Sequence, residues 1–388
     1  MTKSIQNELN SFFAKLNDKD YNILTVTKGA LTQARAKLNH TAFIELSNHA
    51  VEEFYKNEKT RLWNGFRLIA IDGSSSNLPT HASVIQEFGS YSSGCKNSVE
   101  SSLARVSLIY DVLNYITLDA RIENQEFSEC ALMKEQLNTG ILKQGDLFLA
   151  DRGYPSNALM YDLLHSNIDF CFRMRSHWKE VSDFSNSNEK SKIVRLELDR
   201  KDKALVEKHK ASDRYFTCRM VAVELDSGEK EILCTSLLDE EKFTNEAIKE
   251  LYHLRWGIEE AYKLLKVRME LSNYSGKTAH SVRQDFYAKI FMMNMCAIMS
   301  FPIEEKIRKE NKANQTRKYK QQINKTSVVA NVKSSWFAIW LKDKLSEILE
   351  SLDKIFYGAK EIIRPDRKVK RKKYRYPDKK LSPPYKRI

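Results

Sequence analysis

The hydrophobic and polar positions of this chain change their period along its length, and each change predicts a different kind of element. Up to about residue 60, apolar residues recur at three- and four-residue spacing, as in Asn10–Leu16 and Ala30–Leu38, which predicts amphipathic helices. Two short apolar runs, Phe66–Ile71 and Gly145–Ala150, instead predict central strands that are buried on both faces. A helical N-terminal region therefore precedes a strand-rich body.

The remaining pattern predicts an α/β fold with an insertion. Segments 105–113 and 115–122 have the pattern of a hairpin, and 126–137 has the pattern of a helix. Residues 177–230 are polar and rich in Ser, Asn and Lys, with two alternating segments, so we expect an inserted strand-rich subdomain. The apolar stretch Phe286–Phe301 is too short to span a bilayer and predicts a buried helix.

A long helix, which Thr244 is expected to cap, carries the most informative polar residues. At 100° per residue, Tyr252, Arg255, Glu259 and Lys266 fall within roughly 60° of one another. An apolar seam runs along a separate arc and would face a core. The alternative is a solvated helix with ion pairs, because Glu259 and Lys263 have the favourable four-residue spacing.

Two further acids follow the two apolar strands. Asp72 and Asp151 each come directly after a buried run, and functional residues gather at the carboxyl ends of strands in open sheets. A single acid there is more often a turn former or helix cap. Together with Glu259, however, they would form three converging carboxylates, which suit hard divalent ions such as Mg²⁺ or Mn²⁺. Two such ions can promote phosphoryl displacement, and Arg255 and Lys266 suit the flanking phosphates.

Charge and cysteine usage narrow the class of protein. The net charge is +13, and the segment Arg364–Ile388 holds twelve basic and two acidic residues, which favours phosphate-backbone contact over a merely solvated tail. An anionic membrane surface is disfavoured because no apolar anchor adjoins this tail. The six cysteines include no Cys-x-x-Cys pair, which argues against a zinc site and favours a reducing cytosol.

These motifs resemble those of DDE transposases of the insertion-sequence-four family. The resemblance covers about residues 27–271 and rests on Asp72-Gly-Ser-Ser-Ser-Asn-Leu-Pro, on Asp151-Arg-Gly-Tyr, and on the Tyr-x2-Arg-x3-Glu-x6-Lys signature that starts at Tyr252. It implies an RNase H-like catalytic domain, a metal triad of Asp72, Asp151 and Glu259, and DNA contacts by Tyr252, Arg255 and Lys266. It also implies that residues 177–230 are the β-rich insertion of such enzymes. Together with the pattern along the chain, this predicts a helical N-terminal region that is a candidate for DNA binding (1–62), a first core segment (63–176), the insertion (177–230), a second core segment with the Glu-bearing helix (231–302), and a helical and basic C-terminal region that contacts DNA (303–388).

Several residues keep two interpretations. Arg152 and Tyr154 are expected to touch DNA beside the metal site, or else to order the strand-to-helix turn. Trp256 could stack on a base, although core packing is favoured. The basic N-terminal helices around Arg35 are either a small DNA-binding bundle or a plain helical cap.

The expected function is that of a transposase that cuts transposon ends and joins the 3′-hydroxyl to target DNA, with double-stranded DNA as partner. Work at two DNA ends implies a dimer in the DNA complex. The expected location is the bacterial cytoplasm, with the nucleoid. The rivals are an RNase H-like nuclease without strand transfer, which needs the same triad, and a non-catalytic DNA-binding protein, for which Glu259 and Mg²⁺ would be dispensable.

Overall fold

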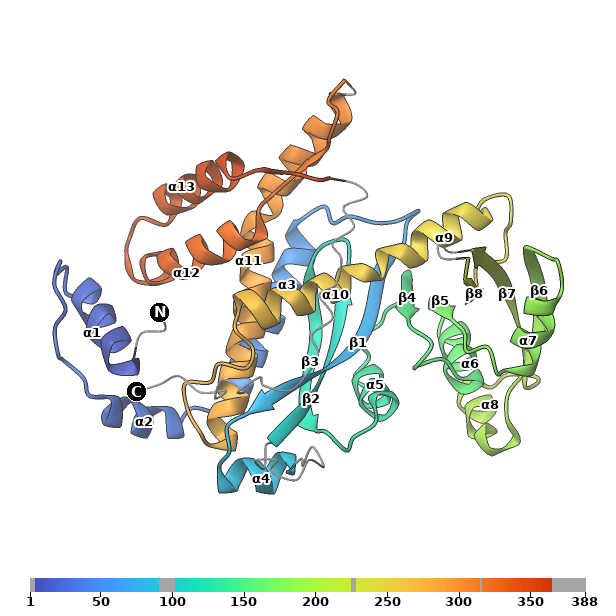
Figure 1. Ribbon diagram of the computed structural model, residues 1–388, viewed down its shortest axis with the longest axis horizontal. Helices are drawn as coiled ribbons and strands as arrows, with labels where there is room; N and C mark the ends of the chain where they lie inside the picture. The colour runs from blue at the N-terminus through green and yellow to red at the C-terminus, as the bar shows by residue number, and fades with distance from the viewer. Residues whose placement is uncertain (1–3, 91–101, 225–227, 315, 365–388) are drawn as a thin grey trace. The chain divides into compact units, whose positions relative to one another are not determined.

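The computed structural model describes residues 4–90, 102–224, 228–314 and 316–364, which fall into two compact units. We call residues 57–75 and 105–262 the sheet unit. We call residues 1–56, 76–104 and 263–388 the helical unit. Figure 1 shows the elements of both units, coloured along the chain.

One mixed sheet of eight strands, in the order β3-β2-β1-β4-β5-β8-β7-β6, provides the framework. Strand β4 pairs in parallel with β1 and with β5, whereas β8 joins β5 and β7 in antiparallel pairs. A mixed sheet flanked by helices agrees with the predicted α/β class (Figure 1). The strands are β1 (Arg67–Leu78), β2 (Ser102–Asp111), β3 (Ile116–Asn124), β4 (Asp146–Ala150), β5 (Asp169–Arg173), β6 (Ser191–Glu197), β7 (Tyr215–Glu224) and β8 (Lys230–Thr235), with β9 (Gln321–Gln322) and β10 (Glu361–Ile362) as a separate pair.

Side-chain caps begin many of the helices. The hydroxyls of Ser128, Ser156 and Thr244 each accept a hydrogen bond from a backbone N–H in the first turn that follows. The predicted cap at Thr244 is thereby confirmed. The helices are α1 (Ile5–Leu16), α2 (Lys28–Ala36), α3 (Thr41–Asn57), α4 (Ala82–Phe88), α5 (Glu129–Leu137), α6 (Asn157–His165), α7 (Lys179–Asn186), η1 (Arg200–Asp202), α8 (Ala204–His209), α9 (Asn245–Leu254), α10 (Trp256–Lys263), η2 (Leu264–Arg268), α11 (Ala279–Ala313), α12 (Lys325–Leu341) and α13 (Leu345–Gly358).

The two predicted central strands are buried as their composition indicates. Leu68–Ile71 of β1 and Leu147–Ala150 of β4 have no exposed surface. Where both strands begin, Arg67 donates two hydrogen bonds of 2.7 Å to the carboxylate of Asp146, which satisfies a buried charge. The expected end of the first strand is wrong, because β1 continues through the Gly-Ser-Ser-Ser segment to Leu78. Small residues permit this extension, and Ser76 lies in hydrogen-bond contact with the Tyr274 hydroxyl at 3.0 Å.

The segment 177–230 does not build a sheet of its own. It contributes β6 and β7, which extend the main sheet beyond β8, together with the short helices α7 and α8 (Figure 1). Helix α7 packs on β7 and β8, and α8 packs on α6. The strand pattern is therefore confirmed, but the segment is an extension of the main sheet that also carries helices.

The predicted long helix is interrupted. Helix α9 ends at Leu254, α10 begins at Trp256, and the chain tightens between them, because the Arg255 N–H donates to the Tyr252 carbonyl three residues earlier. Residues Leu264–Arg268 then form a π-helix, which shifts the angular position of the residues that follow. The uniform 100° geometry therefore does not extend to Lys266.

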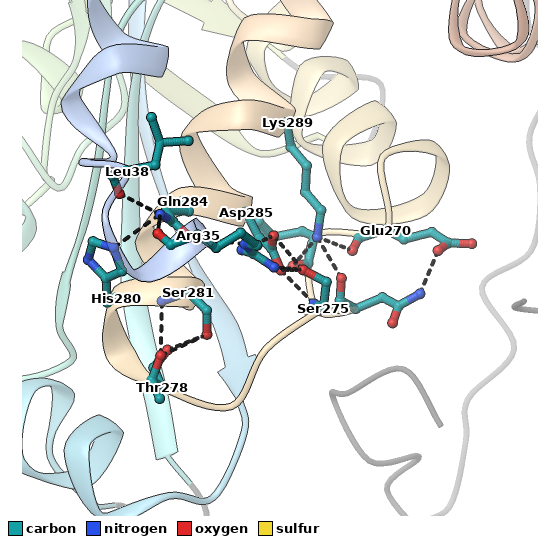
Figure 2. A network of polar contacts seen from close by, with 12 residues as sticks. Arg35, Leu38, Glu270, Ser275, Thr278, His280, Ser281, Gln284, Asp285 and Lys289 are labelled. Atoms are coloured by element: carbon teal, nitrogen blue, oxygen red, sulfur yellow. Dashed lines mark hydrogen bonds and ion pairs between the residues drawn. The ribbon is translucent and has the colours of Figure 1, made fainter. Parts of the chain in front are cut away.

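Helix α11 organises the helical unit. It is long and apolar enough to cross a membrane by length and composition, yet 56% of its most apolar window is buried, as in the core helix of a soluble protein. Figure 2 shows how the α2 region is bound to it: Arg35 donates to Gln284, Ser275 and Asp285, and the Gln284 amide donates to the carbonyls of Arg35 and Leu38. The Arg35 guanidinium therefore stabilises this unit, which agrees with the plain-cap interpretation for this residue.

Lys289 of α11 holds the loop that follows the π-helix. Its ammonium donates to the carbonyls of Glu270, Leu271 and Asn273 at 2.9, 3.2 and 2.8 Å, and Figure 2 shows the contact with Glu270. Glu270 has a φ of 53°, a conformation that a residue with a side chain adopts at a cost. One cation therefore stabilises a turn that the backbone alone would disfavour.

We expect Lys289→Met to lower the free energy of unfolding by about 1–3 kcal/mol, because the loop carbonyls lose a charged donor. Thermal or urea unfolding of the full chain measures this change. Lys309→Met, at an exposed position of the same helix, is the matched control and should change stability by less than about 0.5 kcal/mol. Equal stability of the two variants would contradict the assignment.

Candidate functional site

The first two predicted acids lie at the same level of the sheet. The parallel register of β1 and β4 ends with Ala70 beside Leu149, and Asp72 and Asp151 each follow this last pair by two residues. Neighbouring strands are about 4.8 Å apart, so the two backbones bring these acids together. Asp151 directly follows its strand as predicted, whereas Asp72 lies within β1. Asp72 is therefore positioned by the parallel pairing of β1 with β4, and not by a strand end as predicted.

The pKa of the Asp72 carboxyl is raised well above its ordinary value. Burial raises the pKa of its carboxyl to about 6, and the negative charges of Glu259 and Glu129 act in the same direction. The Gly73 N–H, which donates to the Asp72 carboxylate at 2.9 Å, and the charge of Arg255 lower it only in part. The charged form of Asp72 is therefore destabilised, as expected for a carboxylate that lacks a full counter-charge.

Glu259 joins this group through Arg255. The Arg255 Nη2 donates to Glu259 Oε1 at 2.9 Å, one helical turn away, and the Arg255 side chain is only 7% exposed. Burial would lower the pKa of Arg255, but Tyr252, Asp151 and Glu259 raise it above its ordinary value. A single guanidinium thus interacts with all three predicted acids, since its charge also acts on Asp72.

Tyr252 and Arg173 position Asp151. The Tyr252 hydroxyl donates to Asp151 Oδ1 at 3.2 Å, and Arg173 on β5 lies 3.7 Å from the same oxygen. Arg173 also pairs with Glu231 at 2.8 Å, so it serves two carboxylates. Burial raises the pKa of Tyr252, which keeps the phenol protonated as a donor. Two cations and a phenol therefore surround the predicted acids.

The donor chemistry fits a hard divalent cation. Three carboxylate side chains supply oxygen ligands, and the raised pKa of Asp72 shows that more positive charge would be favourable there. Within the part of the chain that the structure describes, no three Asp, Glu, His or Cys side chains form a ready-made metal-binding group. In this conformation Glu259 is engaged with Arg255.

Sequence reasoning missed Glu129, Arg105 and Tyr262. Arg105 Nη1 donates to Glu129 at 2.7 Å, and a Cβ at Gly73 would lie 2.8 Å from the Glu129 carboxyl carbon, so Gly73 makes room for this acid. The Tyr262 hydroxyl donates to the Asp72 carbonyl at 2.8 Å. The helical period could have identified Tyr262, which lies about 20° from Arg255 on the helical wheel. The sequence offers no comparable signal for Glu129.

The other predicted residues occupy different environments. Arg152 is exposed beside Asp151, and its backbone N–H donates to the Asp151 carboxylate at 2.7 Å. Tyr154 is buried, and its N–H donates a hydrogen bond to the Asp151 carbonyl that closes the turn, which supports the turn-ordering interpretation.

Trp256 is 51% exposed, so the prediction of core packing is wrong. Lys266 is exposed in the helical unit, and the basic tail after Arg364 lies outside the described residues.

Comparisons with known proteins agree with the sequence motifs. The family model for the transposase DDE domain matches residues 63–295. No curated protein gives a significant match. One similar solved structure is described as a cryo-EM structure of the piggyBac transposase synaptic complex with hairpin DNA. The similarity has 10% identity and a TM-score of 0.44, and it covers 75% of this chain and 57% of that chain.

The chain thus spans somewhat more than half the length of that transposase, and a similarity at this TM-score carries no argument about the site. The family match is different in kind, because it covers more than half of the chain and includes Asp72, Asp151 and Glu259. This protein therefore belongs to the transposase DDE domain family.

Proposed function

We propose that this protein is a divalent-metal-dependent DNA transposase of an insertion sequence, related to the insertion-sequence-four family, with an RNase H-like catalytic core. The observation that carries the proposal is that the charge of one buried arginine, Arg255, acts on Asp72, Asp151 and Glu259 alike. Asp72 and Asp151 each follow the last paired residues of β1 and β4 by two positions, and the charge of Glu259 raises the pKa of Asp72. Such a group in a transposase family member suits phosphodiester chemistry.

Asp72, Asp151 and Glu259 would hold Mg²⁺ or Mn²⁺, in two ions, through carboxylate oxygens. Once bound, the ions would activate the attacking hydroxyl or water and stabilise the leaving oxygen. Tyr252 keeps the Asp151 carboxylate oriented by donating its phenolic proton to it. Arg173, 3.7 Å from that carboxylate, limits its other orientations. These residues contribute by positioning and by charge, and no covalent bond to the enzyme is needed.

DNA contacts are proposed for Arg255, Lys266 and Arg152, whose charges suit phosphate oxygens. Tyr252 would act beside them, and Tyr154 would act indirectly by ordering the turn next to Asp151. The transposon ends and the target would both be double-stranded DNA, handled by a dimer. The nucleoid of a bacterial cytoplasm is the proposed location.

The test uses the full chain and DNA duplexes that carry the inverted repeats flanking its coding sequence. We expect cleavage at the repeat ends with Mg²⁺ or Mn²⁺ and none in EDTA. Asp151→Asn should lose this cleavage while keeping the circular dichroism spectrum. Absence of end cleavage with either ion, or full activity of Asp151→Asn, would refute the proposal.

A second substrate separates transposition from simple hydrolysis. A duplex with a pre-cut 3′-hydroxyl end is incubated with the chain and a circular target plasmid. Joined products are expected for a transposase. Cleavage of the intact substrate without any joining would instead identify an RNase H-like nuclease.

A further inference from the structure

Arg255 is a buried positive charge among the candidate metal ligands. Only 6% of the residue is exposed, and its Nη2 donates to Glu259 Oε1 at 2.9 Å. Its Cζ lies 5.5 Å from the centre of the Tyr252 ring, which helps to keep the cation in this place.

The contact with Glu259 has a consequence for metal binding. A carboxylate oxygen that accepts a charge-assisted hydrogen bond from a guanidinium is less available to a cation, because both compete for the same lone pairs. This agrees with the finding that, within the described ranges, no three potential ligands stand together as a metal-binding group. Arg255 and a divalent ion therefore compete for the Oε1 atom of Glu259.

We propose that Arg255 is a positioning residue that holds Glu259 in the DNA-free protein, and that a DNA phosphate releases Glu259 to the metal by drawing Arg255 away. This inference rests on the proposed function, because it takes the three acids as metal ligands. It adds a coupling: DNA binding and metal binding strengthen each other through one arginine.

The unused donor of Arg255 supports this role. Its Nε is buried and has no hydrogen-bond partner among the described residues, which is unfavourable for a donor removed from water. The planar guanidinium can bind a phosphate through two parallel hydrogen bonds, whereas a lysine offers only a point charge. A phosphodiester beside Glu259 would therefore satisfy Nε and compete with the bond from Nη2.

The test measures Mn²⁺ affinity of the full, DNA-free chain by the electron paramagnetic resonance signal of free Mn²⁺. Arg255→Gln is expected to bind Mn²⁺ about tenfold more tightly than the wild type, within the usual range of such couplings. Arg255→Lys keeps the charge but loses the planar fork, so its affinity should rise by only about threefold. The double variant Arg255→Gln/Glu259→Gln should lose the gain.

The second measurement adds a duplex with the repeat ends. The Mn²⁺ affinity of the wild type should rise by about the same tenfold, whereas that of Arg255→Gln should show little further rise. Mn²⁺ that the DNA itself binds is measured with the Glu259→Gln chain and the same duplex, and is subtracted. A folded Arg255→Gln chain that binds Mn²⁺ no more tightly than the wild type would overturn the inference. If this variant does not fold, an unchanged affinity of Arg255→Lys would overturn it. Wild-type end cleavage combined with either result would reject the coupling and leave the proposed function standing.

Discussion

Glu259→Gln is expected to lower Mg²⁺-dependent DNA cleavage by about 10³-fold or more, which corresponds to about 4 kcal/mol of transition-state stabilisation. Glutamine has nearly the same shape and can still accept the hydrogen bond from Arg255, so the local structure should persist. It lacks the negative charge with which Glu259 would bind a divalent ion. Initial rates on the repeat-end duplex, at saturating Mg²⁺, measure the effect.

Glu260→Gln is the matched control, because Glu260 is exposed on the same helix and lies about 100° away from its neighbour. This variant should keep at least about half of the wild-type rate. If both variants are equally active, the assignment of Glu259 is wrong. If both are equally impaired while folded, the helix matters through its net charge and not through one carboxylate.

The second large effect concerns stability. Asp72→Asn is expected to raise the free energy of unfolding above pH 7 in EDTA by about 3 kcal/mol, while abolishing cleavage. Burial raises the pKa of folded Asp72 from its ordinary 3.8 to about 6, so between these pH values the folded chain holds a proton that the unfolded chain has lost. The free energy of unfolding therefore falls as pH rises through this window, and asparagine removes that loss.

Urea unfolding of both chains at pH 4, 5, 6 and 8 tests this expectation. The stability difference should be small at pH 4, grow through pH 5 and 6, and be constant above about pH 7. Asp183→Asn, at an exposed position on α7, is the control and should show no such growth. A difference that is independent of pH would contradict the role given to burial of the Asp72 carboxyl.

Both effects have one physical origin. The site brings together acids that the protein only partly neutralises, since Arg255 is shared among three of them. The negative charge of these carboxylates is unfavourable for folding but is available to bind cations. Such a compromise between stability and activity is common. Lys289 in the helical unit differs, because its ammonium donates hydrogen bonds to loop carbonyls.

The sequence by itself determined the local elements and the identity of the acids. Continuous apolar runs specified the buried parts of β1 and β4, Leu68–Ile71 and Leu147–Ala150, because segments buried on both faces favour apolar residues. Caps such as Thr244 and the hydrogen-bonding capacity of small polar residues fixed where helices begin. The order of Asp72, Asp151 and Glu259 along the chain indicated a shared site, since these residue types suit metal ions.

Only the tertiary structure decided the surroundings of those acids. The parallel pairing of β1 with β4, each of which leads to one acid, joins two strands distant in sequence, and local patterns do not encode this. The break at Arg255 and the π-helix after Lys263 depart from the regular helical period, and no pattern in the sequence indicated either of them. The proximity of Glu129 to Gly73 likewise arises only when α5 packs near β1, since side chains far apart in sequence become neighbours only in the folded chain.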